Sequence, residues 1–478
     1  MSMLGRNDAS VVGGSAAVVA RFRERLRGSV LCSGDAGYEE ARRVWNGNID
    51  RRPFIIARCS GVADVIQAVE LARTNGLLLS VRGGAHNAAG HATCDGGIVI
   101  DLSPMNAIRI DPARRTAFVQ GGATWAAFDR EAQAFGLATT GGTVSNTGVA
   151  GLTLGGGLGW LMGAAGLSCD NLVSADVVTA DGRFLRASAT EHEDLFWGVR
   201  GGGGNFGIVT ALDFRLHPVG PLVLGGMVLH PLAHATDVLR FYQEFVQTLP
   251  DEAEAYAALM TSPDGDPVIA MLLGYNGALD AGERVLAPAR AFGSPLADLV
   301  GPMPYTARQS MIDAGFAAHG VQRYWKSGLA AALTDEIIDL LVDGAHRFPS
   351  AMSAMALFWI HGAVTRVAPE ATAYGARQAQ WDINAIAQWI DQADTAGHVA
   401  WTRELWSAVE PLTTGNAYIN HIAGDDRAER IRSSYGSNYD RLVAVKNAYD
   451  PQNLFRLNAN VKPTLVRSAD HGVAGRDQ

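Results

Sequence analysis

The chain has 478 residues, of which 48% are hydrophobic and 18% are charged, and this apolar content excludes a disordered protein. A net charge of −9 argues against a nucleic-acid-binding protein, and no stretch reaches the ~20 continuous apolar residues of a membrane-spanning helix. The first ten residues lack the apolar core of a secretory signal, and four cysteines without a CxxC spacing fit neither a disulfide framework nor a zinc site. We therefore expect a cytoplasmic protein of two or three domains that binds no metal, no nucleic acid and no membrane.

The first clear pattern along the chain is a helix followed by a strand. Ser60 is a suitable N-cap, apolar residues recur at helical spacing over 62–72, and Gly76 would end the helix. The apolar run at 77–81 has the length of a strand and leads directly into a glycine loop. This succession predicts a first half that mixes helices with strands.

Two further patterns follow. Asp181-Gly182 separates two apolar runs and predicts a tight β-hairpin, and residues 208–216 predict another strand. The segment 217–221 combines two prolines with a glycine, which is typical of a domain boundary. We therefore expect a first domain over residues 1–217.

Beyond this boundary the composition changes. Helices are expected over 233–248 and 333–348, and strands over 268–274 and 355–364. The polar segment 428–449 predicts a single helix near the C-terminus. We expect a second domain over 218–429, and a segment 430–478 that returns to the first domain.

Glycine is concentrated in one part of the chain, since 26 of the 55 glycines lie between positions 76 and 207. Glycine lets a ligand approach the backbone closely, so the excess indicates a large ligand bound on main chain, although tight turns between short strands would also produce it. The run 202–207 matches GxGxxG, but the segment after it predicts a strand and not a helix. This context argues against a nicotinamide-dinucleotide fingerprint.

Two side chains beside these glycine runs are candidates for chemistry. His86 ends a strand-to-glycine loop, where an imidazole is presented rather than buried, and with His91 it lacks the third ligand of a metal site. Cys169 closes a glycine-rich segment, which fits either a small buried hydrophobe or a reactive thiolate. The spacing alone does not distinguish these two alternatives.

The motifs form an ordered series along nearly the whole chain. Their segments are 81–87, 141–143, 148–159, 166–172, 197–207, Tyr418-Ile419-Asn420 and 449–455. In this order they resemble the vanillyl-alcohol oxidase superfamily, and specifically the berberine-bridge-enzyme-like oxidases. The series is far more specific than any single motif in it.

The resemblance implies a covalently bound FAD. In this family a histidine of the Arg-Gly-Gly-x-His loop is joined to the 8α-methyl carbon of the flavin, and a cysteine of the later glycine-rich segment is joined to C6. His86 and Cys169 stand at the matching positions, so the resemblance implies the bicovalent branch of the family. Two such bonds would hold the flavin in an open site and raise its reduction potential.

The glycine runs would then supply backbone N–H groups to the pyrophosphate, which agrees with an acidic protein that binds a dianionic cofactor. Besides His86 and Cys169, the residues that the resemblance assigns to FAD are Arg82, Gly83, Gly84, Ala85, Asn87, Gly141, Gly142, Thr143, Gly148, Gly151, Leu152, Gly155, Gly156, Gly157, Gly159, Leu172, Gly207, Ile208, Val209 and Asn420.

The family also implies a catalytic tyrosine at the first position of the Tyr-x-Asn motif, here Tyr418, with Asn420 beside it. As a general base it would take the hydroxyl proton of an alcohol while the hydride goes to flavin N5. An unperturbed phenol with a pKa of ~10 is a weak base at neutral pH, so we expect a nearby cation, with Lys326 first and Arg323 second.

Three positions depart from the family pattern. His421 stands where many members have an aromatic residue, and His361 stands where glycine is usual, so either imidazole could replace Tyr418 as the base. The position of Leu172 influences oxygen access in relatives, and leucine is bulkier than valine there. A dehydrogenase with another electron acceptor is therefore an alternative to an oxidase.

We expect an α+β fold with a two-lobed FAD-binding domain and a substrate domain whose antiparallel sheet is covered by helices. The expected enzyme is an FAD-dependent oxidase of a C–OH group in a carbohydrate or a secondary-metabolite alcohol, with O2 as acceptor and H2O2 as product, in a monomer or a homodimer. Oxidative cyclisation or C–N oxidation of a natural product is the alternative.

Overall fold

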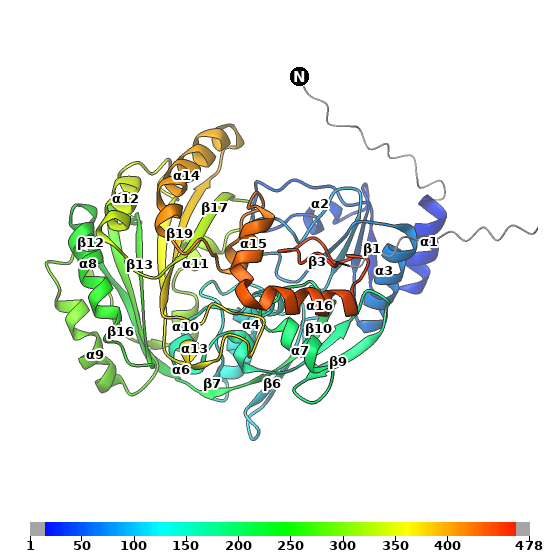
Figure 1. Cartoon of the computed structure of the whole chain (residues 1–478), viewed down its shortest axis with the longest axis horizontal. Coiled ribbons are helices and arrows are strands. Elements are labelled where there is room, and N and C mark those ends of the chain that lie inside the picture. The colour runs from blue at the N-terminus through cyan, green and yellow to red at the C-terminus, as the bar shows by residue number, and fades with distance from the viewer. Residues whose placement is uncertain (1–14, 465–478) are drawn as a thin grey trace, which may run out of the picture.

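The structure, a computed structural model, describes residues 15–464 and combines helices with four β-sheets. Figure 1 shows one large sheet of green and yellow strands with helices along its outer side, while the blue and cyan elements occupy the opposite part of the molecule. The predicted α+β class is confirmed.

The first sheet contains the strand that leads into the glycine loop. Its strands, in the order β1-β2-β4-β3, are β1 (Ser29–Leu31), β2 (Ile55–Arg58), β4 (Ile98–Asp101) and β3 (Leu79–Arg82). The strands β2 and β3 both pair in parallel with β4, and such pairing needs a crossover connection. Helix α3 (Val62–Asn75) supplies it and, with α1 (Ser15–Arg25), covers the apolar residues of the sheet.

The second sheet is antiparallel throughout. Its strands, in the order β5-β6-β10-β8-β9, are β5 (Ile108–Asp111), β6 (Thr116–Gln120), β10 (Ile208–Arg215), β8 (Leu172–Val178) and β9 (Phe184–Ser188). The predicted hairpin at Asp181-Gly182 joins β8 to β9 and is confirmed. Strand β10, which the sequence also predicts, is the central strand of this sheet.

The third sheet has eight antiparallel strands in the order β15-β12-β14-β13-β18-β19-β17, with β16 paired to β12. They are β12 (Leu222–Pro231), β13 (Ala253–Thr261), β14 (Pro267–Tyr275), β15 (Ala297–Asp298), β16 (Gly301–Pro304), β17 (Gln322–Ala330), β18 (Ala354–Ile360) and β19 (Gln380–Trp389). The helices that pack on this sheet are α8 (Ala235–Val246), α9 (Leu279–Ala291), α12 (Asp335–His346) and α14 (Thr395–Val409). The sheet and its helical cover are as the sequence predicts.

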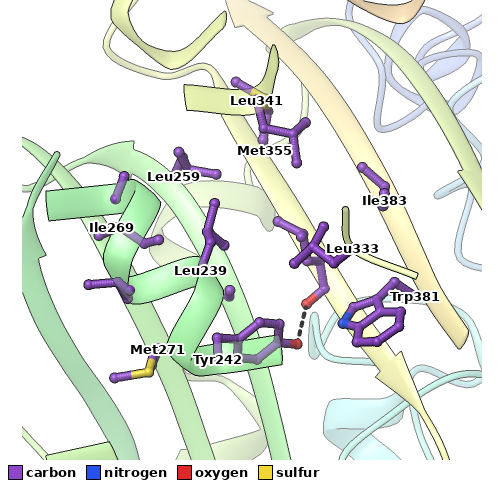
Figure 2. Close-up of a cluster of buried hydrophobic side chains, with 14 of the residues drawn as sticks. Leu239, Tyr242, Leu259, Ile269, Met271, Leu333, Leu341, Met355, Trp381 and Ile383 are labelled. Carbon is purple, nitrogen blue, oxygen red and sulfur yellow. Dashed lines mark hydrogen bonds between the residues drawn. The ribbon is translucent and has the colours of Figure 1, made fainter. Parts of the chain in front are cut away.

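Alternation along the strands gives this sheet two different faces. In β18, Met355 and Leu357 point to the helices, whereas Ala356 and Phe358 point to the opposite face. Figure 2 shows Met355 beside Leu341 of α12. Tyr242 of α8 belongs to the same cluster, and its hydroxyl donates to the Ala255 carbonyl at 3.0 Å. The helix-covered face is therefore the core, and the other face is free to line a cavity.

Three local predictions need correction. The N-cap of α3 is Gly61 and not Ser60, because the Ser60 hydroxyl donates to Asp64 instead. The strand expected over 355–364 ends at Ile360, since Gly362 turns the chain with φ 61° into the short helix α13 (Ala363–Arg366).

The helix expected over 428–449 is the third correction. It is split into α15 (Ala428–Tyr435) and α16 (Tyr439–Tyr449) at Gly436, which has φ 55°. Helix α16 is anchored by Lys446, whose fully buried ammonium donates to Asp450 at 2.7 Å and to the carbonyl of Asn205 at 2.8 Å. This contact holds the C-terminal segment against the first half of the chain (Figure 1). Among the described residues, no helix is long and apolar enough to cross a bilayer.

Candidate active site

A large cavity lies between the glycine loops of the first half and the open face of the eight-stranded sheet. One wall comes from the loop after β3, from residues 142–154 and from the run 203–209. The opposite wall comes from β17, β18 and β19, and residues 418–422 lie between the two. The cavity thus brings together most of the segments on which the sequence prediction depends.

Fourteen of the residues assigned to FAD from the sequence line this cavity. They are Gly83, Gly84, Ala85, His86, Asn87, Gly142, Thr143, Gly148, Gly151, Leu152, Gly207, Ile208, Val209 and Asn420.

The glycines of this wall allow two loops to touch. A Cβ atom on Gly84 would lie 2.3 Å from the backbone nitrogen of Gly148, so neither position tolerates a side chain. None of the described residues that line the cavity is Asp, Glu, Lys or Arg. A dianionic cofactor in this cavity would therefore be met by backbone N–H groups and polar uncharged side chains, which fits the predicted mode of binding.

His86 presents a neutral imidazole to the cavity. Burial lowers the pKa of His86 to about 3. The amide of Asn146 donates to the Ala317 carbonyl at 2.7 Å, so its Oδ1 faces Nε2 of His86 at 2.9 Å and accepts the proton there. Nδ1 of His86 then carries the lone pair, which is what a covalent bond to a flavin carbon requires.

Eight of the assigned residues do not line the cavity: Arg82, Gly141, Gly155, Gly156, Gly157, Gly159, Cys169 and Leu172. The glycines among them allow close packing behind the wall. A Cβ atom on Gly155 would lie 2.1 Å from the side-chain oxygen of Asn420, and one on Gly159 would lie 1.7 Å from the carbonyl oxygen of Gly141. The absence of a side chain at these two positions therefore allows close contacts between protein segments.

Arg82 and Leu172 are also occupied elsewhere. The Arg82 guanidinium donates to the carbonyl oxygens of Ala41 and Arg43, and the Leu172 side chain packs in the core beside the second sheet. The predicted influence of Leu172 on oxygen access has no support in this geometry.

Cys169 lies outside the lining of the cavity. It lies in a short 3-10 helix (Ser168–Asn171), is 0% exposed and packs in a cluster with Leu158, Met162 and Tyr374. Burial, followed by the charge of Asp170, raises the pKa of the Cys169 thiol above its ordinary value, which disfavours the reactive thiolate. Cys169 does not line the cavity that His86 lines, and the second bond to the flavin stays a prediction.

Tyr418 lines the cavity with its hydroxyl held by three donors. The oxygen accepts from the backbone N–H of Gly157 at 2.8 Å, from that of Leu158 at 3.2 Å and from the Asn420 amide at 2.7 Å. Asn420 also donates to the Leu152 carbonyl at 2.9 Å. Burial raises the pKa of Tyr418 above its ordinary value even though these three donors act in the opposite direction.

The expected cationic partner of Tyr418 is replaced by those neutral donors. The Lys326 ammonium does not line the cavity and instead lies 2.8 Å from both Asp425 and Asp426. Burial alone would lower the pKa of Lys326, but the hydrogen bonds to the two carboxylates outweigh it and raise the pKa. The Arg323 guanidinium is equally engaged, since it donates to the carbonyl oxygens of Trp45 and Ala318.

The two additional histidines differ in position. His361 does not line the cavity and lies 3.6 Å from the buried carboxylate of Glu254. His421 lines the cavity, and its Nδ1 lies 2.9 Å from Oδ2 of Asp382, which is fully buried. Of the alternative bases considered from the sequence, the structure therefore brings only His421 to the cavity beside Tyr418.

Sequence reasoning missed several residues of the site. Trp45 and Asn146 contact His86, Trp325 and Phe358 line the substrate-facing wall, and Asp382 pairs with His421. A usable signal existed only for Asp382, an acidic residue between the apolar residues Trp381 and Ile383 of β19. An acidic residue at such a position indicates a buried polar contact.

Comparisons with known proteins agree with this architecture. A family model described as an FAD binding domain matches residues 53–188, and one described as berberine and berberine like matches residues 417–462. The chain is 32% identical over 448 residues to (R)-6-hydroxynicotine oxidase of Paenarthrobacter nicotinovorans, and the match covers 92% of this chain and 97% of that protein. It is 30% identical over 453 residues to an FAD-linked oxidoreductase of Dictyostelium discoideum, and this match covers 94% of this chain and 98% of that protein.

A solved structure gives the same relationship. The crystal structure of 6-hydroxy-D-nicotine oxidase from Arthrobacter nicotinovorans superimposes with a TM-score of 0.84 at 31% identity, and the match covers 91% of this chain and 98% of that one. The predicted family is confirmed by both kinds of comparison. The chain belongs to the berberine-bridge-enzyme-like family of FAD-linked oxidoreductases.

Proposed function

We propose that this protein is an FAD-dependent oxidase that converts a C–OH group of a neutral aromatic or otherwise apolar small molecule into a carbonyl, with O2 as the electron acceptor and H2O2 as product. FAD, when bound, accepts a hydride from the carbon that carries the hydroxyl group. The protein supplies an apolar site for the substrate and polar groups beside the reacting hydroxyl.

The apolar wall of the cavity carries this proposal. Trp325, Phe358 and Ile386 from the sheet face the cavity together with Ile312 and Phe316. A carbohydrate bound there would lose water from several hydroxyl groups without gaining protein partners, which costs about 1–3 kcal/mol for each unpaired group. An aromatic substrate loses no such hydrogen bonds and gains contact with the rings.

We further propose that FAD is attached through His86 alone. The support is the neutral imidazole at the cavity wall and its fixed orientation by Asn146. The enclosed thiol of Cys169 is not used in this proposal.

C–N oxidation is the second candidate. A relative with 32% identity over 92% of this chain is named for its action on 6-hydroxynicotine. Because no carboxylate is among the described residues lining the cavity, an amine substrate would bind here in its uncharged form.

Anaerobic mixing tests the two candidates directly. The oxidised flavin would be followed at its visible absorbance after addition of 1-phenylethanol, (R)-6-hydroxynicotine or cellobiose, and air would then be admitted while H2O2 is measured. Bleaching by the aromatic alcohol supports the proposal, and bleaching by the hydroxynicotine alone supports the second candidate. Bleaching by cellobiose alone contradicts an apolar substrate, and reoxidation by an artificial dye but not by air contradicts an oxidase.

A further inference from the structure

We infer that His421, oriented and charge-balanced by Asp382, is the general base that takes the proton of the substrate hydroxyl, and that Tyr418 is not. This inference rests on the proposed oxidation of a C–OH group. It assigns a catalytic role to His421 and a positioning role to Asp382.

The sheet register places Asp382 behind His421. Asp382 of β19 lies directly opposite Phe358 of β18, and opposed residues of antiparallel strands share one face. Because Phe358 lines the cavity, Asp382 is directed to the cavity face of the sheet. The carboxylate is 0% exposed, and the His421 ring covers it from the side of the Tyr418 segment.

A chain of hydrogen bonds fixes the carboxylate. The Trp325 indole donates to Oδ1 of Asn384 at 2.8 Å, and the Asn384 amide donates to Oδ2 of Asp382 at 3.0 Å. The same Oδ2 lies 2.9 Å from Nδ1 of His421. A carboxylate only accepts, so Nδ1 carries the proton and Nε2 of the neutral imidazole keeps its lone pair.

Two aromatic contacts hold the imidazole ring in place. Its centroid lies 4.8 Å from that of Trp325, with the planes 28° apart. The Tyr418 ring stands nearly perpendicular to it, at 85° and 4.8 Å. The side chain is 18% exposed and lines the cavity, so this base is both oriented and accessible to a substrate.

Charge balance favours proton uptake at this position. Within residues 15–464, no Lys or Arg side chain pairs with Asp382, and Oδ1 of Asp382 has no hydrogen-bond partner there. A buried carboxylate without a counter-charge is unfavourable. A proton that arrives at Nε2 creates the missing positive charge beside it, as in other histidine–carboxylate pairs.

The reaction balances with these groups. The O–H bond of the substrate breaks and its proton bonds to Nε2 of His421. The adjacent C–H bond breaks, its hydrogen leaves with both electrons as a hydride for FAD, and the C=O double bond forms. The two electrons lost by the alcohol are those gained by FAD.

Tyr418 is poorly suited to the same step. Burial raises the pKa of Tyr418 although the three donors that face its oxygen act in the opposite direction, so the phenol keeps its proton at neutral pH. Its own O–H is then a hydrogen-bond donor. Tyr418 therefore positions His421 and does not take a proton from the substrate.

Four variants test the assignment in the anaerobic reaction with 1-phenylethanol. We expect His421→Gln and Asp382→Asn to lower the limiting rate of flavin reduction by at least about 100-fold, the usual value of a general base, and Tyr418→Phe to lower it by less than about tenfold. His361→Gln is the matched control, because His361 also pairs with a buried carboxylate but does not line the cavity. A 100-fold loss in Tyr418→Phe, with His421→Gln near wild type, overturns the inference.

The pH profile separates charge balance from a structural role. The groups that face His421 are Asp382, Tyr418, Trp325 and Phe358, and of these Asp382 supplies the negative charge. In Asp382→Asn an amide oxygen can still accept from Nδ1, but the imidazolium loses its counter-charge. The acid limb of the reduction rate should therefore move to lower pH by about one unit or more. An unchanged acid limb contradicts the role of Asp382.

Nuclear magnetic resonance tests the inference without any substrate, because it shows which nitrogen of His421 carries the proton. In long-range proton–nitrogen correlation spectra of histidine-labelled protein, the His421 signal is identified by its loss in His421→Gln, or in His421→Asn where the first variant does not retain flavin. We expect the neutral ring to carry its proton on Nδ1. A proton on Nε2 overturns the inference even if 1-phenylethanol reduces the flavin. If no probe reduces the flavin while Nδ1 carries the proton, the proposed function fails and the geometry of the pair stands.

Discussion

The imidazole of His86 lies against the indole of Trp45, with ring centroids 4.3 Å apart and planes 23° apart. The Trp45 indole donates to the Phe316 carbonyl at 2.6 Å, and the Arg323 guanidinium lies 3.7 Å from the centroid of the Trp45 ring. The residue proposed to bind the flavin is thus held through Trp45 by the part of the chain that carries the eight-stranded sheet. Trp45 thus links the loop of His86 to Phe316 and to Arg323 of β17 through direct contacts.

Replacement of His86 by alanine should abolish covalent attachment. We expect FAD to separate from His86→Ala after acid precipitation, whereas the wild-type pellet stays yellow. The measurement is the intact mass of the denatured chain together with the absorbance of the supernatant. His361→Gln serves as the control and should keep its flavin, since His361 does not line the cavity. A covalently bound flavin in His86→Ala would show that another residue forms the bond.

Replacement of Cys169 by alanine should leave the flavin attached and its visible spectrum unchanged. The reason is that the thiol is enclosed and burial keeps it protonated. The same mass measurement applies, with Cys59→Ala as the matched variant of another fully buried free cysteine. A spectral change confined to Cys169→Ala would restore the bicovalent prediction.

Replacement of Phe358 by alanine should weaken substrate binding more than it slows chemistry. Burying an aromatic side chain against a ligand is worth about 1.5–3 kcal/mol, so we expect KM for an aromatic alcohol to rise by roughly tenfold or more. The limiting rate of flavin reduction should change by less than about threefold, because Phe358 makes no contact with the transferred proton. Phe184→Ala, at an exposed phenylalanine, is the control. A fall in the limiting rate with KM unchanged would contradict the assigned role.

Asp129 gives a pH-dependent stability. It lies in α4 (Trp125–Gln133) with Tyr305, Arg308 and Gln309 of α10 (Tyr305–Gln309) facing it. Burial raises the pKa of Asp129 to about 7, against the opposing effects of Gln309 and Arg308. The folded state therefore holds a proton that the unfolded state loses near pH 4, and this contribution to stability is present below pH 4 and is lost as pH rises through about 7.

Asp129→Asn should remove that dependence. We expect the melting temperature of the variant to exceed that of the wild type at pH 8 and to approach it at pH 5, as measured by thermal unfolding at both values. Asp237→Asn, at an exposed aspartate, should melt as the wild type does at both. The sign of this effect would be contradicted if the wild type melted at a higher temperature at pH 8 than at pH 5 and Asp129→Asn did not show this rise.

Local patterns in the sequence predicted most elements well, because they depend on neighbours within one helix or hairpin. The α3 helix and the Asp181-Gly182 hairpin are examples. The prediction of one helix over 428–449 was wrong because the helix is interrupted at Gly436, which has φ 55°. Hydrophobic periodicity averages over many residues and does not reveal a break at one residue. The role of Cys169 is left open by the sequence for a different reason. A glycine-rich setting is equally compatible with a thiol that faces a ligand and with one that packs behind the glycines.

By itself, the sequence determined the family, the presence of an FAD-binding domain and the place of His86 in the loop after a strand, since these depend on residue types in a fixed order. Only the tertiary structure decided which glycines line the cavity and which pack against protein. It also brought Asp382 to His421 across 39 positions of the chain. The physical reason is that side-chain direction depends on sheet register and on contacts between distant segments, and one residue of register shift would turn Asp382 away from His421.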